Sequence, residues 1–84
     1  MHTDDLTDLD REILAFEQDW TSYAGAKESA VLERFGLTPA DYHQRLTRLI
    51  DLPAAELHAP RLVRRLRRLR SARQEQRAAR RVAG

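Results

Sequence analysis

A helix stop and a helix start lie within four residues of each other near the middle of this 84-residue chain. Gly36 follows a helical pattern, and glycine readily takes the positive φ that ends many helices. Thr38 is a good N-cap, Pro39 suits the first helical position, and Asp41 has the spacing of a capping partner. We therefore expect two helices joined by a very short turn, which restricts the chain to a helical arrangement.

Apolar residues recur at helical spacing before this turn. Leu9, Ile13, Phe16 and Trp20 lie four, three and four residues apart, so they predict one helix that ends near residue 20. Thr7 is expected to cap this helix, with the acid three residues later as its capping-box partner. The next break is expected in the glycine-containing segment that follows Trp20.

Two further helices are expected on either side of the marked turn. Gly25 is the expected break point, so the second helix should cover residues 26–35. The third helix should cover residues 39–51. Its buried face is expected to consist of Tyr42, Leu46, Leu49 and Ile50.

The charge of the chain is divided very unevenly. Residues 1–60 carry five basic and twelve acidic side chains, a net of −7, whereas residues 61–84 carry ten arginines and one acid, a net of +9. This asymmetry indicates a nucleic-acid or a membrane partner, and the short apolar face of the basic helix, without Trp or Phe, argues against the membrane. We divide the chain into an acidic arm at 1–6, a trihelical domain at 7–52, a connector at 53–59 and an Arg-rich helical tail at 60–84.

The short turn and the basic tail together predict DNA binding. Two helices joined by a Gly-containing turn describe a helix-turn-helix, whose second helix enters the major groove. We therefore expect an all-α fold, with a three-helix helix-turn-helix core followed by a C-terminal Arg-rich helix. The base-reading candidates on the third helix are Ala40, His43, Gln44 and Thr47. The candidates for phosphate contacts are Lys27, Arg45, Arg48, Arg61, Arg64, Arg65, Arg67, Arg68, Arg70 and Arg73.

Other interpretations stay open on the sequence alone. Any three-helix bundle has a polar outer face, so the chain could instead be a protein-interaction module that docks on RNA polymerase or another regulator. An Arg-rich helix could also bind RNA. Tyr23 could donate its hydroxyl to a phosphate, whereas Trp20 is expected in the core. The stripe that could pack on the core or form a homodimer seam consists of Leu62, Leu66 and Leu69.

No pattern indicates an enzyme, a cofactor or a metal. The absence of cysteine excludes disulfides and thiolate zinc sites, and the three histidines are isolated from one another. No apolar run approaches the ~20 residues needed to span a bilayer, and the acidic N-terminus does not resemble a signal peptide. We expect a cytoplasmic DNA-binding protein, either a transcriptional regulator or a nucleoid-associated protein, without membrane contact. Its Arg-rich helix would lie on phosphates or in a minor groove.

The segment GLTPADYHQRLTRLI resembles the reading half of the helix-turn-helix in region four of bacterial sigma factors. This resemblance implies a helix that reads DNA, on a fold that also docks on RNA polymerase. Those proteins usually have a small alanine where this chain has Leu32, so Leu32 should either shift the packing or lie partly exposed. The matching positions are Gly36, Leu37, Thr38, Tyr42, Arg45 and Leu46.

Nearly the whole chain is similar to a family of short actinobacterial proteins of unknown function, taken to contain a helix-turn-helix. The similarity rests on the block from Trp20 to Glu28 and on the Arg-Arg-Leu-Arg-Arg-Leu-Arg run. The reading helix of that family more often has Arg-Tyr-Tyr-Gln where this chain has Asp41-Tyr42-His43-Gln44. Only Tyr42 and Gln44 are therefore shared, and the family implies a fold but no common target sequence.

Overall fold

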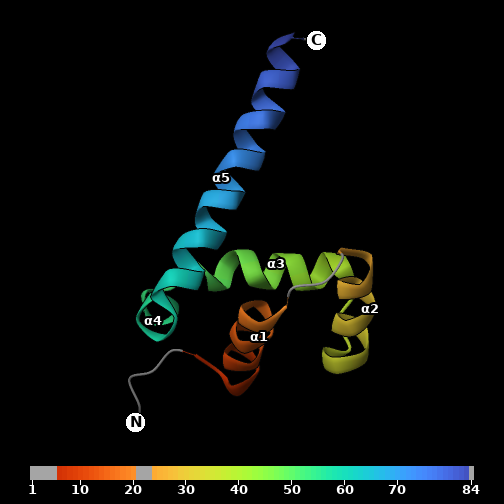
Figure 1. Ribbon diagram of the computed structural model, residues 1–84, viewed down its shortest axis with the longest axis vertical. Helices are drawn as coiled ribbons and strands as arrows, with labels where there is room; N and C mark the ends of the chain where they lie inside the picture. Colours follow the sequence, from red (N-terminus) through yellow and green to blue (C-terminus); the bar gives the residue numbers. More distant parts are fainter. Residues whose placement is uncertain (1–5, 21–23, 84) are drawn as a thin grey trace.

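The computed structural model describes residues 6–20 and 24–83, and over these residues it is all-α (Figure 1). The all-α prediction is therefore confirmed. The described helices are α1 (Asp8–Asp19), α2 (Ala24–Phe35), α3 (Pro39–Leu49), α4 (Pro53–His58) and α5 (Pro60–Ala83).

The N-terminus of α1 has the expected capping box. The backbone N–H of Asp10 donates to Thr7 Oγ1 at 3.0 Å, and the backbone N–H of Thr7 donates to Asp10 Oδ2 at 3.1 Å. Two N–H groups that the helix leaves unpaired are thus satisfied. The acids of this first turn also face the positive end of the helix dipole.

The turn between α2 and α3 consists of residues 36–38. Gly36 has a φ of 68°, the positive value expected of a helix-ending glycine. Thr38 Oγ1 accepts the backbone N–H of Asp41 at 3.1 Å, and Pro39 is the first residue of α3. The helix stop and the helix start are therefore both confirmed. In contrast, the break expected at Gly25 is wrong, because α2 already begins at Ala24 and tolerates the glycine in its first turn.

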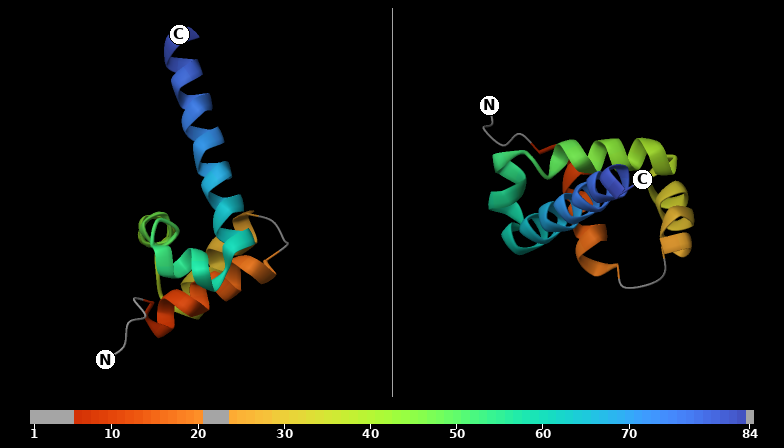
Figure 2. Two further views of the ribbon diagram at one scale, coloured as in Figure 1. Left: turned by 90° about the vertical axis from the view of Figure 1, so that its left-hand side faces the viewer. Right: turned by 90° about the horizontal axis from the view of Figure 1, so that it is seen from above.

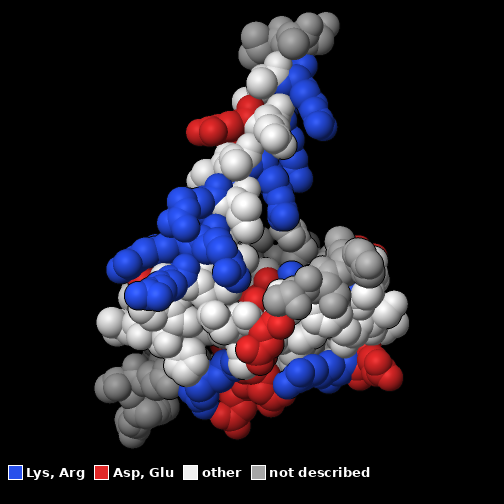
Figure 3. Space-filling model, in the orientation of Figure 1, with Lys and Arg blue, Asp and Glu red and all other residues white. Residues whose placement is uncertain are grey.

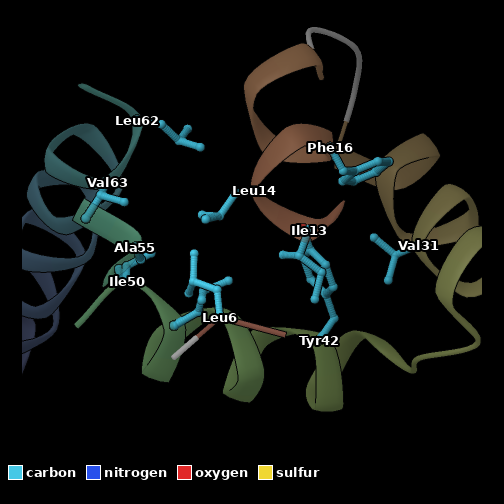
Figure 4. Packing of buried hydrophobic residues seen from close by; sticks show 11 residues of the cluster. Leu6, Ile13, Leu14, Phe16, Val31, Tyr42, Ile50, Ala55, Leu62 and Val63 are labelled. Carbon is cyan, nitrogen blue, oxygen red and sulfur yellow. The ribbon is translucent and has the colours of Figure 1, made fainter. Parts of the chain in front are cut away.

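The hydrophobic core surrounds α1 (Figure 4). Ile13, Leu14 and Phe16 of α1 are buried and meet Val31 of α2 and Tyr42 of α3. The expected face of α3 is confirmed, although Leu46 is only half-buried. The other buried apolar residues are Leu6, Leu49, Ile50, Ala55, Leu62 and Val63.

Two expected boundaries differ from the structure because apolar side chains outside 7–52 pack into this core. Leu6 falls within the expected acidic arm but is only 7% exposed. The expected connector at 53–59 contains α4, whose Ala55 is fully buried. Leu62 and Val63 bring the first turns of α5 into the same core. The folded unit thus continues into α5 and does not end at residue 52.

The outer part of α5 projects away from the other helices (Figures 1 and 2). Every described side chain from Ser71 to Arg81 is exposed. Seen from above, α5 leans from α4 across the body toward the end of α3 that joins α2 (Figure 2). The angle between α5 and α3 is therefore open on one side.

Candidate nucleic-acid interface

The polar face of α3 is accessible. Ala40, His43 and Gln44 are exposed, and Thr47 is half-buried. Because they lie three or four residues apart, these side chains share one side of the helix. His43, Gln44 and Thr47 border a shallow hollow together with Arg48, which is exposed. The base-reading candidates therefore form one accessible surface on α3.

A groove joins this surface to α5. It has a volume of about 340 Å³, and His43 and Thr47 line it from the side of α3. Arg65, Arg73 and Arg77 line it from the side of α5. Lys27 and Arg70 line it as well. Two base-reading candidates and four phosphate candidates are thus brought together, with Arg77 as a fifth cation that the sequence prediction did not include.

The arginines of the outer part of α5 share one face. Arg77, Arg80 and Arg81 lie four, seven and eight residues after Arg73, which places all four within one stripe of a helix. Glu75, two residues from both Arg73 and Arg77, lies on the opposite side. Since Arg73 and Arg77 line the groove, the whole stripe is turned toward the open angle above α3.

Three other arginines of α5 pair with the body of the protein. Arg70 forms a two-pronged pair with Asp51, at 3.1 and 2.9 Å, and Arg67 donates to Glu56 at 2.9 Å and to the backbone oxygen of Ile50 at 2.7 Å. Arg64 lies 3.4 Å from the same Glu56. These contacts fasten α5 to the corner between α3 and α4. All three are phosphate candidates that the structure pairs with nearby carboxylates, and their contact with phosphates stays a prediction.

The pKa values of the two acids reflect this pairing. The hydrogen bond from Arg70 is the main reason that the pKa of Asp51 lies below its usual value. For Glu56, the hydrogen bonds from Arg67 and then from Arg64 lower the pKa. Both carboxylates therefore stay charged at lower pH than free side chains would.

Lys27 and Arg45 are also directed inward. Lys27 Nζ donates to Glu17 Oε1 at 2.9 Å, and the Tyr42 hydroxyl donates to Glu17 Oε2. Arg45 Nε lies 3.5 Å from Asp10 Oδ1 as an ion pair, without hydrogen-bond geometry. The sequence predicts both cations on the outer surface, but partners on α1 hold them against the body.

Glu17 is the centre of the contact among α1, α2 and α3. Its side chain is only 4% exposed. Burial, the hydrogen bond to Glu17 and the charge of Glu17 together raise the pKa of Tyr42 well above its ordinary value. The sequence did contain a signal, because Glu17 lies four residues after Ile13 and one after Phe16, within the buried side of the helix.

The remaining candidates are exposed cations. Their guanidinium groups have no ion-pair partner within residues 6–20 and 24–83. On the face shown in Figure 3, basic side chains follow α5 and its base, and most of the acidic ones lie on the body below. This group consists of Arg48, Arg61, Arg65, Arg68 and Arg73.

The other sequence predictions have mixed outcomes. Trp20 is half-buried and stacks on Phe16 with ring centroids 5.2 Å apart, and Leu32 is 56% exposed, as one of the two alternatives predicted. Leu62 is buried in its own core, as expected if the stripe packs on the body, whereas Leu69 is 46% exposed; a homodimer stays a prediction. Tyr23 lies outside the described residues.

Two other kinds of site find no support in the structure. Among the described residues, no group of three or more potential metal ligands comes together. None of the described helices is both long enough and apolar enough to cross a membrane.

Fold and surface define a small helical protein with a short turn between two helices and a projecting basic helix. The chain belongs to the family described as "Protein of unknown function (DUF3263)", whose model matches residues 5–78. This match confirms the predicted membership in a family of unknown function, and of the basic stripe it includes Arg73 and Arg77 but not Arg80 and Arg81. Comparisons with curated proteins and with solved structures give no match.

Proposed function

We propose that the protein binds double-stranded DNA in the angle between α3 and α5. The observation that carries this proposal is the shared groove, which His43 and Thr47 of α3 line together with Arg73 and Arg77 of α5. Side chains able to pair with base edges and cations able to neutralise phosphates thus face the same space. The exposed Gln44, beside them on α3, is suited to an adenine edge.

The division of the arginines supports the same arrangement. Arg64, Arg67 and Arg70 fix the base of α5, and this fixes the direction in which its outer part projects. The stripe that begins at Arg73 keeps its charge available for a polyanion. Each phosphate that it neutralises should contribute a slope of about −0.9 to the dependence of log K on log salt.

A paired substitution experiment tests the proposed surface. Arg73→Gln/Arg77→Gln removes two charges from the groove, whereas Arg61→Gln/Arg68→Gln removes two from the other side of α5. Fluorescence anisotropy with a labelled duplex should show a weaker affinity and a shallower salt slope for the first variant. The second variant should change both much less. Equal losses of affinity in the two variants would mean that α5 acts only through its net charge. The proposed binding of DNA on the groove side of α5 would then be wrong.

Gln44→Ala tests whether α3 reads bases. If it does, the substitution should lower the affinity for one duplex sequence and leave the affinity for an unrelated one nearly constant. The difference between the two duplexes should be about 1–3 kcal/mol, the value for a good bidentate contact. His43→Ala is the companion variant on the same surface. The same small loss on every duplex would leave phosphate binding as the whole of the interaction.

A further inference from the structure

The floor of the groove between α3 and α5 is apolar. Trp20, Leu46, Leu66 and Leu69 line it, and Leu69 is 46% exposed. Apolar surface costs about 25 cal/mol for each Å² that stays in contact with water. Phosphate groups would not cover such a floor, so the binding of DNA to the rim does not account for it.

The rim of the same groove is positively charged. Arg65, Arg73 and Arg77 line it without an ion-pair partner among the described residues. The buried acid Glu17 also borders the groove, but Lys27 and Tyr42 already bind it. The indole Nε1 of Trp20 is buried without a hydrogen-bond acceptor. The groove therefore combines an apolar base with unpaired cations.

The size of the groove suits a small ligand. Ligand pockets have volumes of about 300–1,000 Å³, and the volume here is about 340 Å³. The unpaired cations beside the apolar surface favour an occupant that carries both an apolar body and a negative charge.

We infer that this groove binds a small amphipathic organic anion, with an apolar acyl or aromatic body and a carboxylate head. The body lies on Trp20, Leu66 and Leu69, where it covers the exposed apolar surface. The carboxylate lies between Arg73 and Arg77, whose guanidinium groups pair with carboxylates in a planar, two-pronged way. Binding of the body gains from apolar burial, and the head determines the orientation.

This site has a regulatory consequence that rests on the proposed function. Arg73 and Arg77 would serve both the carboxylate and the DNA phosphates, so the two ligands would compete. An anion in the groove would lower the affinity for DNA and reduce the number of phosphates neutralised. The protein would then release DNA in response to a small molecule.

Trp20 provides a direct readout, because it is the only tryptophan of the chain and lines the groove. Decanoate, at concentrations below those at which it forms micelles, is the probe, and the titration is made on the full chain without DNA. The expected result is a saturable change in Trp20 fluorescence. Acetate, which lacks the body, and decanol, which lacks the charge, should bind much more weakly.

Substitutions then test the site. Leu69→Asp should abolish the fluorescence change, and Arg73→Gln/Arg77→Gln should weaken decanoate binding by about tenfold or more. The matched variant Arg61→Gln/Arg68→Gln should bind decanoate as the natural chain does. Far-UV circular dichroism confirms that each variant is folded, and the altered residues are all exposed in the structure.

The outcomes separate the two proposals. No saturable change with decanoate, or an equal change in all variants, would overturn the groove proposal whatever the protein does with DNA. A response to an acidic amphipathic peptide but not to decanoate would also overturn it, in favour of a protein partner. Decanoate that binds but does not displace a labelled duplex would contradict the competition alone.

Discussion

Two glycines illustrate how a single residue affects this fold. Gly36 has a φ of 68°, a conformation that side-chain-bearing residues adopt only with strain, whereas Gly25 lies in the first turn of α2. Apart from the adjoining residues and the backbone of the same helix, no atom of the described residues would lie within 4 Å of an added Cβ at either position. The backbone conformation alone therefore distinguishes the two sites.

Alanine substitutions at the two glycines should have opposite effects. Gly36→Ala should lower the free energy of unfolding by about 1 kcal/mol, because it places a Cβ in the left-handed region. Gly25→Ala should raise it by about 0.5 kcal/mol, because alanine is the better helix former. Urea denaturation measures both. The same sign for both substitutions would contradict the different backbone conformations.

Glu17 is the residue on which three helices depend. Glu17→Ala should lower the free energy of unfolding by about 3 kcal/mol, because Lys27 and the Tyr42 hydroxyl would lose their partner. Glu12→Ala, on the exposed side of the same helix, is the matched control and should change stability by less than about 0.5 kcal/mol. Similar losses in the two variants would mean that Glu17 is not a structural centre.

Tyr42 should make the fold sensitive to high pH. Its pKa is raised in the folded protein, so the folded state favours the neutral hydroxyl. The resulting stability is complete below the unfolded pKa of about 10 and is lost as the pH rises above it. Urea midpoints measured between pH 8 and pH 11 should fall less steeply in Tyr42→Phe. Parallel curves for the two proteins would contradict this role.

At the scale of the elements, local signals predicted the helices better than the contacts between them. The capping residues Thr7 and Thr38 and the stop at Gly36 act within one turn, so the sequence alone reveals them. The role of Arg70 depends on an acid nineteen residues away, and Lys27 binds an acid ten residues away. Such partners become visible only when the helices are assembled.

The contact between α5 and the α3–α4 corner should weaken in acid. The pKa values of Asp51 and Glu56 are lowered by their arginines, so their contribution to stability is present above about pH 4 and is lost as the pH falls below it. The variant Asp51→Asn/Glu56→Gln should therefore lose less stability than the natural chain between pH 7 and pH 3. Thermal melts followed by circular dichroism would show the difference.

A charge-matched control makes this acid test specific. Glu12→Gln/Glu33→Gln removes two exposed carboxylates that have no ion-pair partner in the described part of the chain. Its stability should fall with pH as steeply as that of the natural chain. If both double variants behave alike, the acid sensitivity comes from net charge and not from the anchoring of α5.

At the scale of the whole molecule, the body and the projecting helix have separate roles. The body contains the core, to which α5 contributes Leu62 and Val63. The outer part of α5 contributes exposed arginines and no buried residue from Ser71 to Arg81. The sequence predicted the basic helix, and DNA binding stays a prediction. The sequence alone could not show which arginines hold α5 against the body and which stay free on the surface, because this depends on where Asp51 and Glu56 lie.

A chain that ends at Arg70 separates these roles. It keeps the buried residues of α5 and the pairs with Asp51 and Glu56, and it loses Arg73, Arg77, Arg80 and Arg81. Its free energy of unfolding should stay within about 0.5 kcal/mol of that of the full chain, because only exposed residues are removed. Urea denaturation of both chains measures this difference before any binding experiment. A much larger loss would mean that the outer part of α5 also supports the body.

The most direct test of DNA binding in the α3–α5 angle is the salt dependence of duplex affinity for the full chain and for residues 1–70. If the four arginines each neutralise one phosphate, the slope of log K against log salt should be less steep by about 3.6 in the shorter chain. A stable shorter chain with this reduced slope is the predicted result. Equal slopes for the two chains, or no binding by either at low salt, would contradict the account.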